Sequence, residues 1–191
     1  MLLRFLSKGL TKIVTVMMKY ALFDYIPQRK LRRATFEQLD LQRMILGFKD
    51  GRNVYSRWAA RQVARTLSAL DLTETVIICV PASTRCSNAR RWKRFSMLLC
   101  QYTGATDGFD RIQVHGSRRR AHKTGDYELA TNIKHYVHID AEWIRGRKVV
   151  VIDDIITTGQ SSAAFISALE AAGATVVMAV FIAKTKIYKH G

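Results

Sequence analysis

K-V-V-V-I-D-D-I-I-T-T-G, at residues 148–159, carries the strongest structural signal in this sequence. Its apolar residues 149–152 are mostly β-branched and too few for a helix, which is typical of a strand buried on both faces. Asp153 and Asp154 end the expected strand with two adjacent carboxylates, which need partners in such a place. Apolar residues at helical spacing follow from Ala163 to a stop at Gly173, and T-V-V-M-A-V-F at 175–181 predicts the next strand. The segment is therefore expected to form one β–loop–α–β unit.

The loop after the two aspartates has the chemistry of a phosphate site. Backbone amides at a helix N-terminus favour an anion, hydroxyls add donors, and a glycine lets the backbone approach a ligand closely. The residues expected to bind the phosphate are Thr157, Thr158, Gly159, Gln160 and Ser161. The two aspartates can accept hydrogen bonds from vicinal hydroxyls, so the unit predicts a site for ribose 5-phosphate. The alternative is a strand that ends in two solvated aspartates and an ordinary turn.

This stretch resembles the phosphoribosyl pyrophosphate (PRPP) motif of the type I phosphoribosyltransferases. The resemblance implies an α/β fold with a parallel-sheet, Rossmann-like core flanked by helices. It also implies that Asp153 and Asp154 hold the ribose hydroxyls while the loop holds the 5-phosphate. Magnesium would be the cofactor and would arrive bound to the pyrophosphate. The resemblance implies no direct protein ligand for it, although Asp153 or Asp154 could contact it through a water.

A second strand and loop predict the pyrophosphate site. T-V-I-I-C-V at 75–80 reads as a buried strand, and ligands of open parallel sheets lie beyond the carboxyl ends of strands. Small residues and an arginine follow it, and backbone donors with Arg85 suit pyrophosphate oxygens. The loop consists of Pro81, Ala82, Ser83, Thr84 and Arg85. The alternative is a solvated basic loop.

H-G-S-R-R-R-A-H-K-T-G at 115–125 is a polycationic segment bounded by glycines. It predicts a flexible loop that closes over pyrophosphate and excludes water, through Arg118, Arg119, Arg120 and Lys123. The alternative is a loop on the surface that contacts nucleic acid. The catalytic candidates are Asp153, Asp154, Arg85 and Lys123.

Further motifs recur in the order found in ComF-like (competence-associated) phosphoribosyltransferases, across residues 36–184. They are F-K-D-G at 48–51, V-P-A-S at 80–83, R-R-x-x-x-F at 90–95, A-H-K-T-G at 121–125 and R-G-R-K at 145–148. The chain has a basic segment where such proteins carry a cysteine-rich zinc module, so no zinc is expected. The resemblance implies transfer of a phosphoribosyl group to a nitrogenous base or amine that the sequence does not identify, and it leaves a homodimer open.

The net charge of +16 over 191 residues implies polyanionic partners. The alternative function is a non-catalytic, nucleic-acid-binding protein associated with DNA uptake. In that hypothesis bases would stack on Trp92, Phe95, Tyr102 and Tyr127 beside the basic surface. Three cysteines without a C-x-x-C favour a reducing, cytoplasmic location.

The first twenty residues carry apolar side chains at three- and four-residue spacing, with lysines on another face. This predicts a basic amphipathic helix that docks on the body of the protein, or that touches a membrane surface or a partner through residues 1–20. The expected division is a helical extension at 1–35 and a phosphoribosyltransferase-type domain at 36–191.

Overall fold

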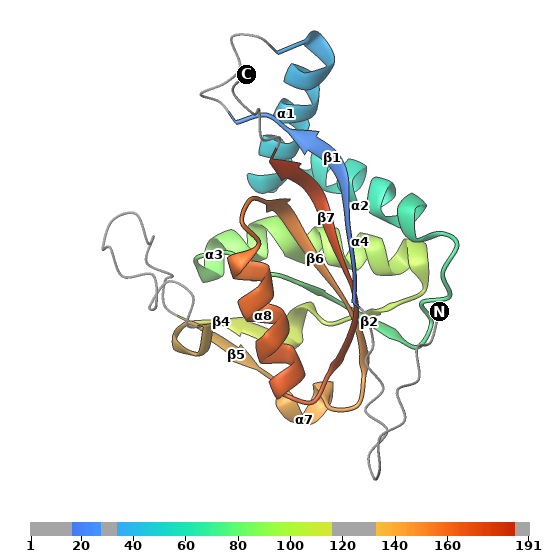
Figure 1. Ribbon diagram of the computed structural model, residues 1–191, viewed down its shortest axis with the longest axis vertical. Helices are drawn as coiled ribbons and strands as arrows, with labels where there is room; N and C mark the ends of the chain where they lie inside the picture. The colour runs from blue at the N-terminus through green and yellow to red at the C-terminus, as the bar shows by residue number, and fades with distance from the viewer. Residues whose placement is uncertain (1–16, 28–33, 116–132, 186–191) are drawn as a thin grey trace, which may run out of the picture.

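The computed structural model describes residues 17–27, 34–115 and 133–185, and its centre is a five-stranded sheet (Figure 1). All neighbours in this sheet are parallel, in the order β1-β7-β6-β2-β3. The strands are β1 (Met18–Tyr25), β2 (Thr75–Cys79), β3 (Thr106–Asp107), β6 (Lys148–Ile156) and β7 (Thr175–Thr185). The expectation of a parallel α/β core is confirmed.

Helices cover both faces of the sheet (Figure 1). One face packs against α1 (Phe36–Lys49), α2 (Asn53–Leu67) and α4 (Arg94–Thr103). The other packs against α8 (Gln160–Ala171) and a small antiparallel pair, β4 (Ile112–Val114) with β5 (Val137–Ile139). Shorter elements are α3 (Arg85–Asn88), a π-helical segment η2 (Ala89–Lys93), η3 (Phe109–Arg111), η4 (Ile133–His135) and α7 (Ala141–Ile144).

The expected N-terminal helix is wrong for the part that the structure describes. Residues from Met18 to Tyr25 form strand β1, which pairs in parallel with β7 at the edge of the central sheet. The spacing of apolar residues was helical, but pairing with a buried neighbouring strand overrides local periodicity. This stretch therefore belongs to the sheet and not to a helical extension; residues 1–16 lie outside the described part.

Strand β6 is longer than the sequence predicts. It continues through Asp153 and Asp154 to Ile156, because Ile155 and Ile156 pair with Ala183 and Lys184 of β7. The helix after it begins at Gln160, three residues earlier than expected. The aspartates therefore lie within a strand, and strand geometry governs the direction of their side chains.

Three aromatic side chains pack together in the core between α1 and α4. The rings of Phe48, Trp92 and Phe95 meet edge to face with centroids 5.3–5.4 Å apart, and all three side chains are fully buried. Trp92 and Phe95 are therefore not available to stack on nucleic-acid bases, and this part of the alternative hypothesis is wrong. Tyr102 is partly exposed, and Tyr127 lies outside the described residues.

No helix in the described ranges is long and apolar enough to cross a membrane. The three cysteines, Cys79, Cys86 and Cys100, are all free thiols.

Candidate functional site

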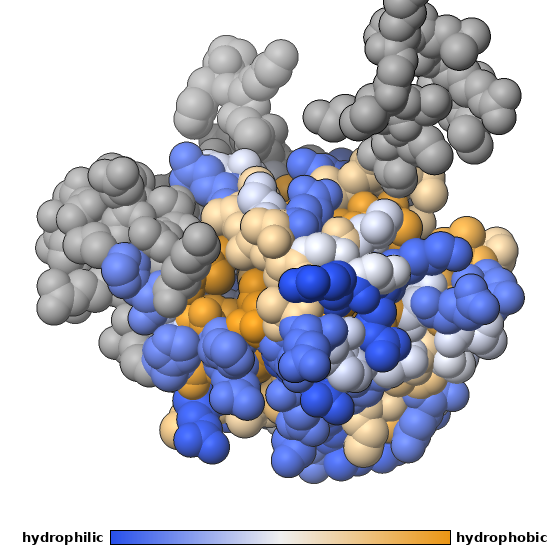
Figure 2. Space-filling view, turned by 90° about the horizontal axis from the view of Figure 1, so that it is seen from below, coloured by the Kyte–Doolittle hydropathy of each residue, from blue (hydrophilic) through white to orange (hydrophobic). Residues whose placement is uncertain are grey.

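The candidate site is a cavity of about 230 Å³ at the carboxyl ends of β2 and β6. The chain leaves β2 toward β3 on one side and leaves β6 toward β7 on the other, so the strand order reverses between them. Such a switch point leaves a crevice where ligands of open α/β sheets bind. A second cavity lies at the opposite end of the sheet, near the amino ends of the strands, and its lining includes Met18, Thr75, Lys148 and Met178. Figure 2 views the molecule from this end. Of these two cavities, only the first is lined by the loops that the sequence predicts to bind phosphate and pyrophosphate.

Both predicted loops reach this cavity. Its lining includes Pro81, Ala82 and Ser83 from the first loop, and Asp153, Asp154, Thr157, Thr158, Gly159, Gln160 and Ser161 from the second. Two residues predicted for the pyrophosphate site do not line it. Thr84 accepts a hydrogen bond from the backbone N–H of Ser87 and caps α3, while Arg85 begins that helix and is exposed. Arg118, Arg119, Arg120 and Lys123 lie outside the described residues.

The first loop is held by a buried side chain. The backbone N–H of Ala82 donates to Oδ1 of Asn88, 2.9 Å away, and Asn88 is buried. Val80 continues the sheet because its N–H donates to the carbonyl of Ile152 at 2.8 Å. The loop is thus attached to the sheet at Val80 and to Asn88 at Ala82, two residues later, and these contacts orient its backbone at the cavity.

The second loop leads directly into the N-terminus of α8. Gly159 has φ +78°, a left-handed conformation that glycine adopts without strain, and it occupies the N-cap position. The N–H of Gln160 donates to Oγ1 of Thr158 at 3.5 Å, and the hydroxyl of Ser162 donates to the carbonyl of Gly159 at 3.0 Å. The positive end of a twelve-residue helix therefore borders the cavity, as in many phosphate sites.

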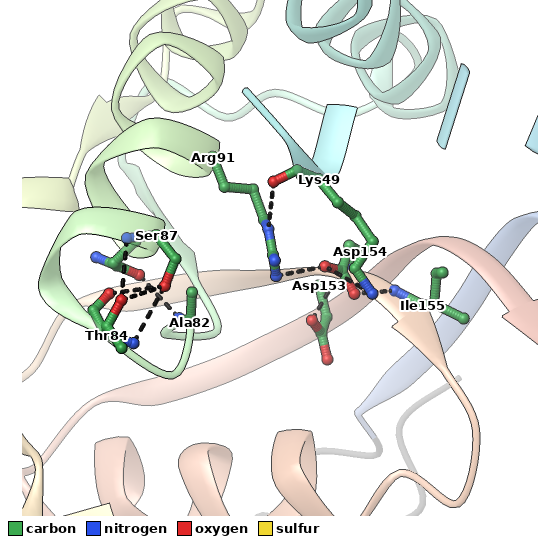
Figure 3. Close-up of polar contacts among 9 residues, drawn as sticks. Lys49, Ala82, Thr84, Ser87, Arg91, Asp153, Asp154 and Ile155 are labelled. Atoms are coloured by element: carbon green, nitrogen blue, oxygen red, sulfur yellow. Dashed lines mark hydrogen bonds and ion pairs between the residues drawn. The ribbon is translucent and has the colours of Figure 1, made fainter. Parts of the chain in front are cut away.

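The two aspartates point to opposite faces of the sheet (Figure 3). Successive residues of a strand alternate in this way, and β6 is still a regular strand where they occur. Asp154 points toward the α1–α4 face, where Arg91 and Lys49 lie, and Asp153 points away from them. Both border the cavity, but their side chains leave the strand in opposite directions.

The two aspartates also differ in the partners that their carboxylate oxygens have within the protein. Oδ2 of Asp154 accepts from Nη1 of Arg91 at 2.6 Å and lies 3.7 Å from Nζ of Lys49, while its Oδ1 accepts from the N–H of Ile155 at 2.6 Å. Within the described part of the chain, Asp153 accepts one hydrogen bond, from the N–H of Asp154 to its Oδ1 at 2.8 Å. Burial, and then the negative charge of Asp154, raise the pKa of Asp153 to about 8.

The sequence matches the family model of the phosphoribosyl transferase domain over residues 56–190. The chain belongs to the phosphoribosyltransferase family. Among solved structures, UMP synthase of Leishmania donovani is 19% identical with a TM-score of 0.44, and the match covers 75% of this chain but only 24% of that one. A phosphoribosyltransferase from Corynebacterium diphtheriae is 17% identical with a TM-score of 0.42, covering 77% of this chain and 86% of that one. No curated protein matches the chain.

The sequence did not single out two cations that contact Asp154. Lys49 ends α1 and Arg91 lies in the π-helical segment η2, and both reach Asp154. Two sequence signals included Arg91, the R-R-x-x-x-F motif and a run of four cations around Trp92, but neither distinguished it from the neighbouring cations. Burial of Trp92 in the aromatic cluster fixes the rotation of this segment and directs Arg91, rather than the exposed Arg90, to the cavity.

Asp153→Asn is expected to stabilise the protein when no ligand is bound. The folded state holds a proton on Asp153 up to about pH 8, whereas the unfolded state releases it near pH 4, so wild-type stability falls as pH rises between these values. The variant lacks this penalty. Its advantage in free energy of unfolding should grow by at least about 1.4 kcal/mol, the equivalent of one pKa unit, between about pH 5 and about pH 8. Urea unfolding across that range measures it, and a constant difference would contradict the raised pKa.

Proposed function

We propose that this protein binds PRPP with magnesium and transfers its phosphoribosyl group to a nitrogenous base or amine, releasing pyrophosphate. The observation that carries the proposal is the meeting of the two loops around one cavity. The N-terminus of α8 and the 157–161 loop offer a phosphate site, and Asp153 and the 81–83 loop lie beside it. Together these groups suit a 5-phosphate, a ribose and a pyrophosphate.

Transfer of the phosphoribosyl group depends on positioning of the substrate and on electrostatic stabilisation more than on covalent catalysis. In the transfer, the bond between the anomeric carbon and a pyrophosphate oxygen breaks and a nitrogen of the acceptor bonds to that carbon. The backbone N–H and the hydroxyl of Ser83, which lines the cavity, would bind the departing pyrophosphate, which lowers the barrier because these donors are already in place. Asp153 would hold the ribose hydroxyls, and the positive charge that develops on the sugar favours the ionised form of its carboxyl group. Fixing both ends of PRPP restricts the reacting carbon to a productive orientation.

The residues at the cavity fit a magnesium ion that arrives with its phosphorylated ligand. In the described ranges no three His, Cys, Asp or Glu side chains are grouped to hold a metal by themselves. Magnesium usually keeps several waters and binds through one or two carboxylates together with substrate phosphates. Asp153 is a carboxylate of this kind at the cavity. When bound, the ion would neutralise charge on the pyrophosphate, and Asp153 would hold it directly or through a water.

We further propose that the protein is a ComF-like member of the family. Three of the motifs that carry the resemblance come together at the site. F-K-D-G supplies Lys49, V-P-A-S supplies the 81–83 loop, and R-R-x-x-x-F supplies Arg91. Segments distant in the chain meet around Asp154, which supports a shared role for these motifs.

Calorimetric titration with magnesium–PRPP tests the proposed function. We expect saturable binding that is at least about tenfold weaker when magnesium is chelated, because the metal screens the charges of the pyrophosphate. A panel of nitrogenous bases and amines should then contain an acceptor that makes the protein release pyrophosphate. Magnesium–ATP, whose ribose carries neither a 5-phosphate monoester nor a pyrophosphate on its anomeric carbon, is the control ligand. Equal affinity for both ligands, or no affinity for PRPP, would contradict the proposal.

A further inference from the structure

Asp154 is saturated by protein partners, whereas Asp153 is not. Each oxygen of Asp154 accepts a hydrogen bond within the protein, and its side chain is only 8% exposed. Asp153 uses one oxygen for a backbone N–H, and its Oδ2 has no partner among the residues that the structure describes. A ligand hydroxyl can therefore bind Asp153 without displacing a protein contact. At Asp154 it would have to compete with a buried ion pair, whose disruption is strongly unfavourable.

Arg91 is fixed by its contacts and still has donors to offer. Nη1 binds Asp154, Nε donates to the carbonyl of Lys49 at 3.5 Å, and the guanidinium carbon lies 5.9 Å from the ring centroid of Trp92. Arginine has five N–H donors, and Nη2 has no partner in the described ranges. The side chain is 18% exposed and lines the cavity, so a fixed cation faces the ligand.

The position of Arg91 assigns it to one end of the ligand. Its segment η2 follows the 81–83 loop and α3 directly, and Asn88, immediately before η2, binds the backbone of that loop. The 157–161 loop enters the cavity separately, at the N-terminus of α8. Arg91 is thus coupled to the loop predicted for pyrophosphate. A planar guanidinium held in one orientation suits two oxygens of a phosphate group.

We propose that the two aspartates do different work: Asp154 positions Arg91 to bind the pyrophosphate group, and Asp153 alone binds the ribose hydroxyls. This assignment rests on the proposed function and states which part of the ligand each aspartate serves. Asp154 is then a positioning residue that acts through Arg91. Its negative charge is balanced by Arg91 and Lys49, so it does not repel a polyanionic ligand.

A double-mutant cycle with two partial ligands tests the assignment. Magnesium pyrophosphate and ribose 5-phosphate are titrated separately into wild type, Arg91→Gln, Asp154→Asn and the double variant. Each single variant should weaken pyrophosphate binding at least about tenfold, and the double variant should lose no more, since residues that act as a unit are not additive. Affinity for ribose 5-phosphate should stay within about twofold of wild type. Asp153→Asn should show the reverse pattern.

Two further variants keep the result interpretable. Arg90→Gln changes the exposed neighbour that does not line the cavity, and it should bind both ligands as wild type does. Arg91→Lys keeps the charge but not the planar fork, so its pyrophosphate affinity should fall between wild type and Arg91→Gln. Should Asp154→Asn fail to fold in thermal unfolding, this graded series at position 91 carries the test alone.

Each outcome supports or overturns a specific statement. Loss of ribose 5-phosphate binding in Asp154→Asn, additive losses in the double variant, or unchanged pyrophosphate binding in Arg91→Gln would overturn the assignment while leaving the proposed function intact. Wild type that binds neither partial ligand nor PRPP would overturn the proposed function itself, and the assignment with it.

Discussion

Thr158→Glu is expected to lower the affinity for ribose 5-phosphate by at least about 100-fold while the protein stays folded. Thr158 lines the cavity beside the N-terminus of α8. A glutamate there places a carboxylate at the proposed phosphate site. Two like charges about 4 Å apart repel by about 4 kcal/mol at an effective dielectric constant of 20. That exceeds the roughly 2.7 kcal/mol that corresponds to a 100-fold change.

The same charge should not harm the fold. A carboxylate near a helix N-terminus interacts favourably with the helix dipole, by about 0.3–1 kcal/mol at an exposed site, and Thr158 is exposed. The melting temperature should therefore stay within a few degrees of wild type or rise. Thr158→Gln is the control, because it matches the size of glutamate without the charge. If Thr158→Gln weakens binding as much as Thr158→Glu does, then shape and not phosphate electrostatics explains the loss.

Gly51→Ala is expected to reduce the free energy of unfolding by roughly 2–5 kcal/mol. Gly51 joins α1 to α2 with φ +72°, which costs a residue with a side chain about 1–2 kcal/mol. A Cβ added there would lie 2.3 Å from the carbonyl oxygen of Arg90 and 2.8 Å from its carbonyl carbon. Backbone atoms cannot rotate away, so overpacking adds another roughly 1–3 kcal/mol. The displaced backbone belongs to η2, which carries Arg91, so pyrophosphate affinity should fall as well.

Gly146→Ala is the matched control for this prediction. Gly146 also has a positive φ, +74°, but a Cβ there would meet no atom within 4 Å. Only the backbone strain of about 1–2 kcal/mol should remain, and binding at the distant cavity should not change. Urea unfolding of both variants measures the difference. Equal destabilisation at the two glycines would show that η2 adapts to the added methyl group.

Local sequence signals were sufficient for the central unit of the fold. The apolar run before Asp153, the hydroxyl-rich turn at Gly159 and the spacing of α8 each depend on neighbouring residues, so they predicted strand, loop and helix in the right order. The same holds for β2 and the 81–83 loop, since a buried strand and the small residues after it are contiguous. The two loops meet because parallel strands end at the same edge of a sheet.

The remaining features depend on contacts between distant parts of the chain. Strand β1 exists through pairing with β7, more than 150 residues away, and local periodicity suggested a helix there instead. Arg91 reaches Asp154 across 63 residues and the carbonyl of Lys49 across 42, while the better sequence candidate, Arg85, is exposed. A π-helical turn and the burial of Trp92 set the direction of Arg91. The amino-acid sequence thus specified which loops form the cavity, and side-chain packing across the core selected the cation that faces it, because that choice depends on helix rotation and not on residue type.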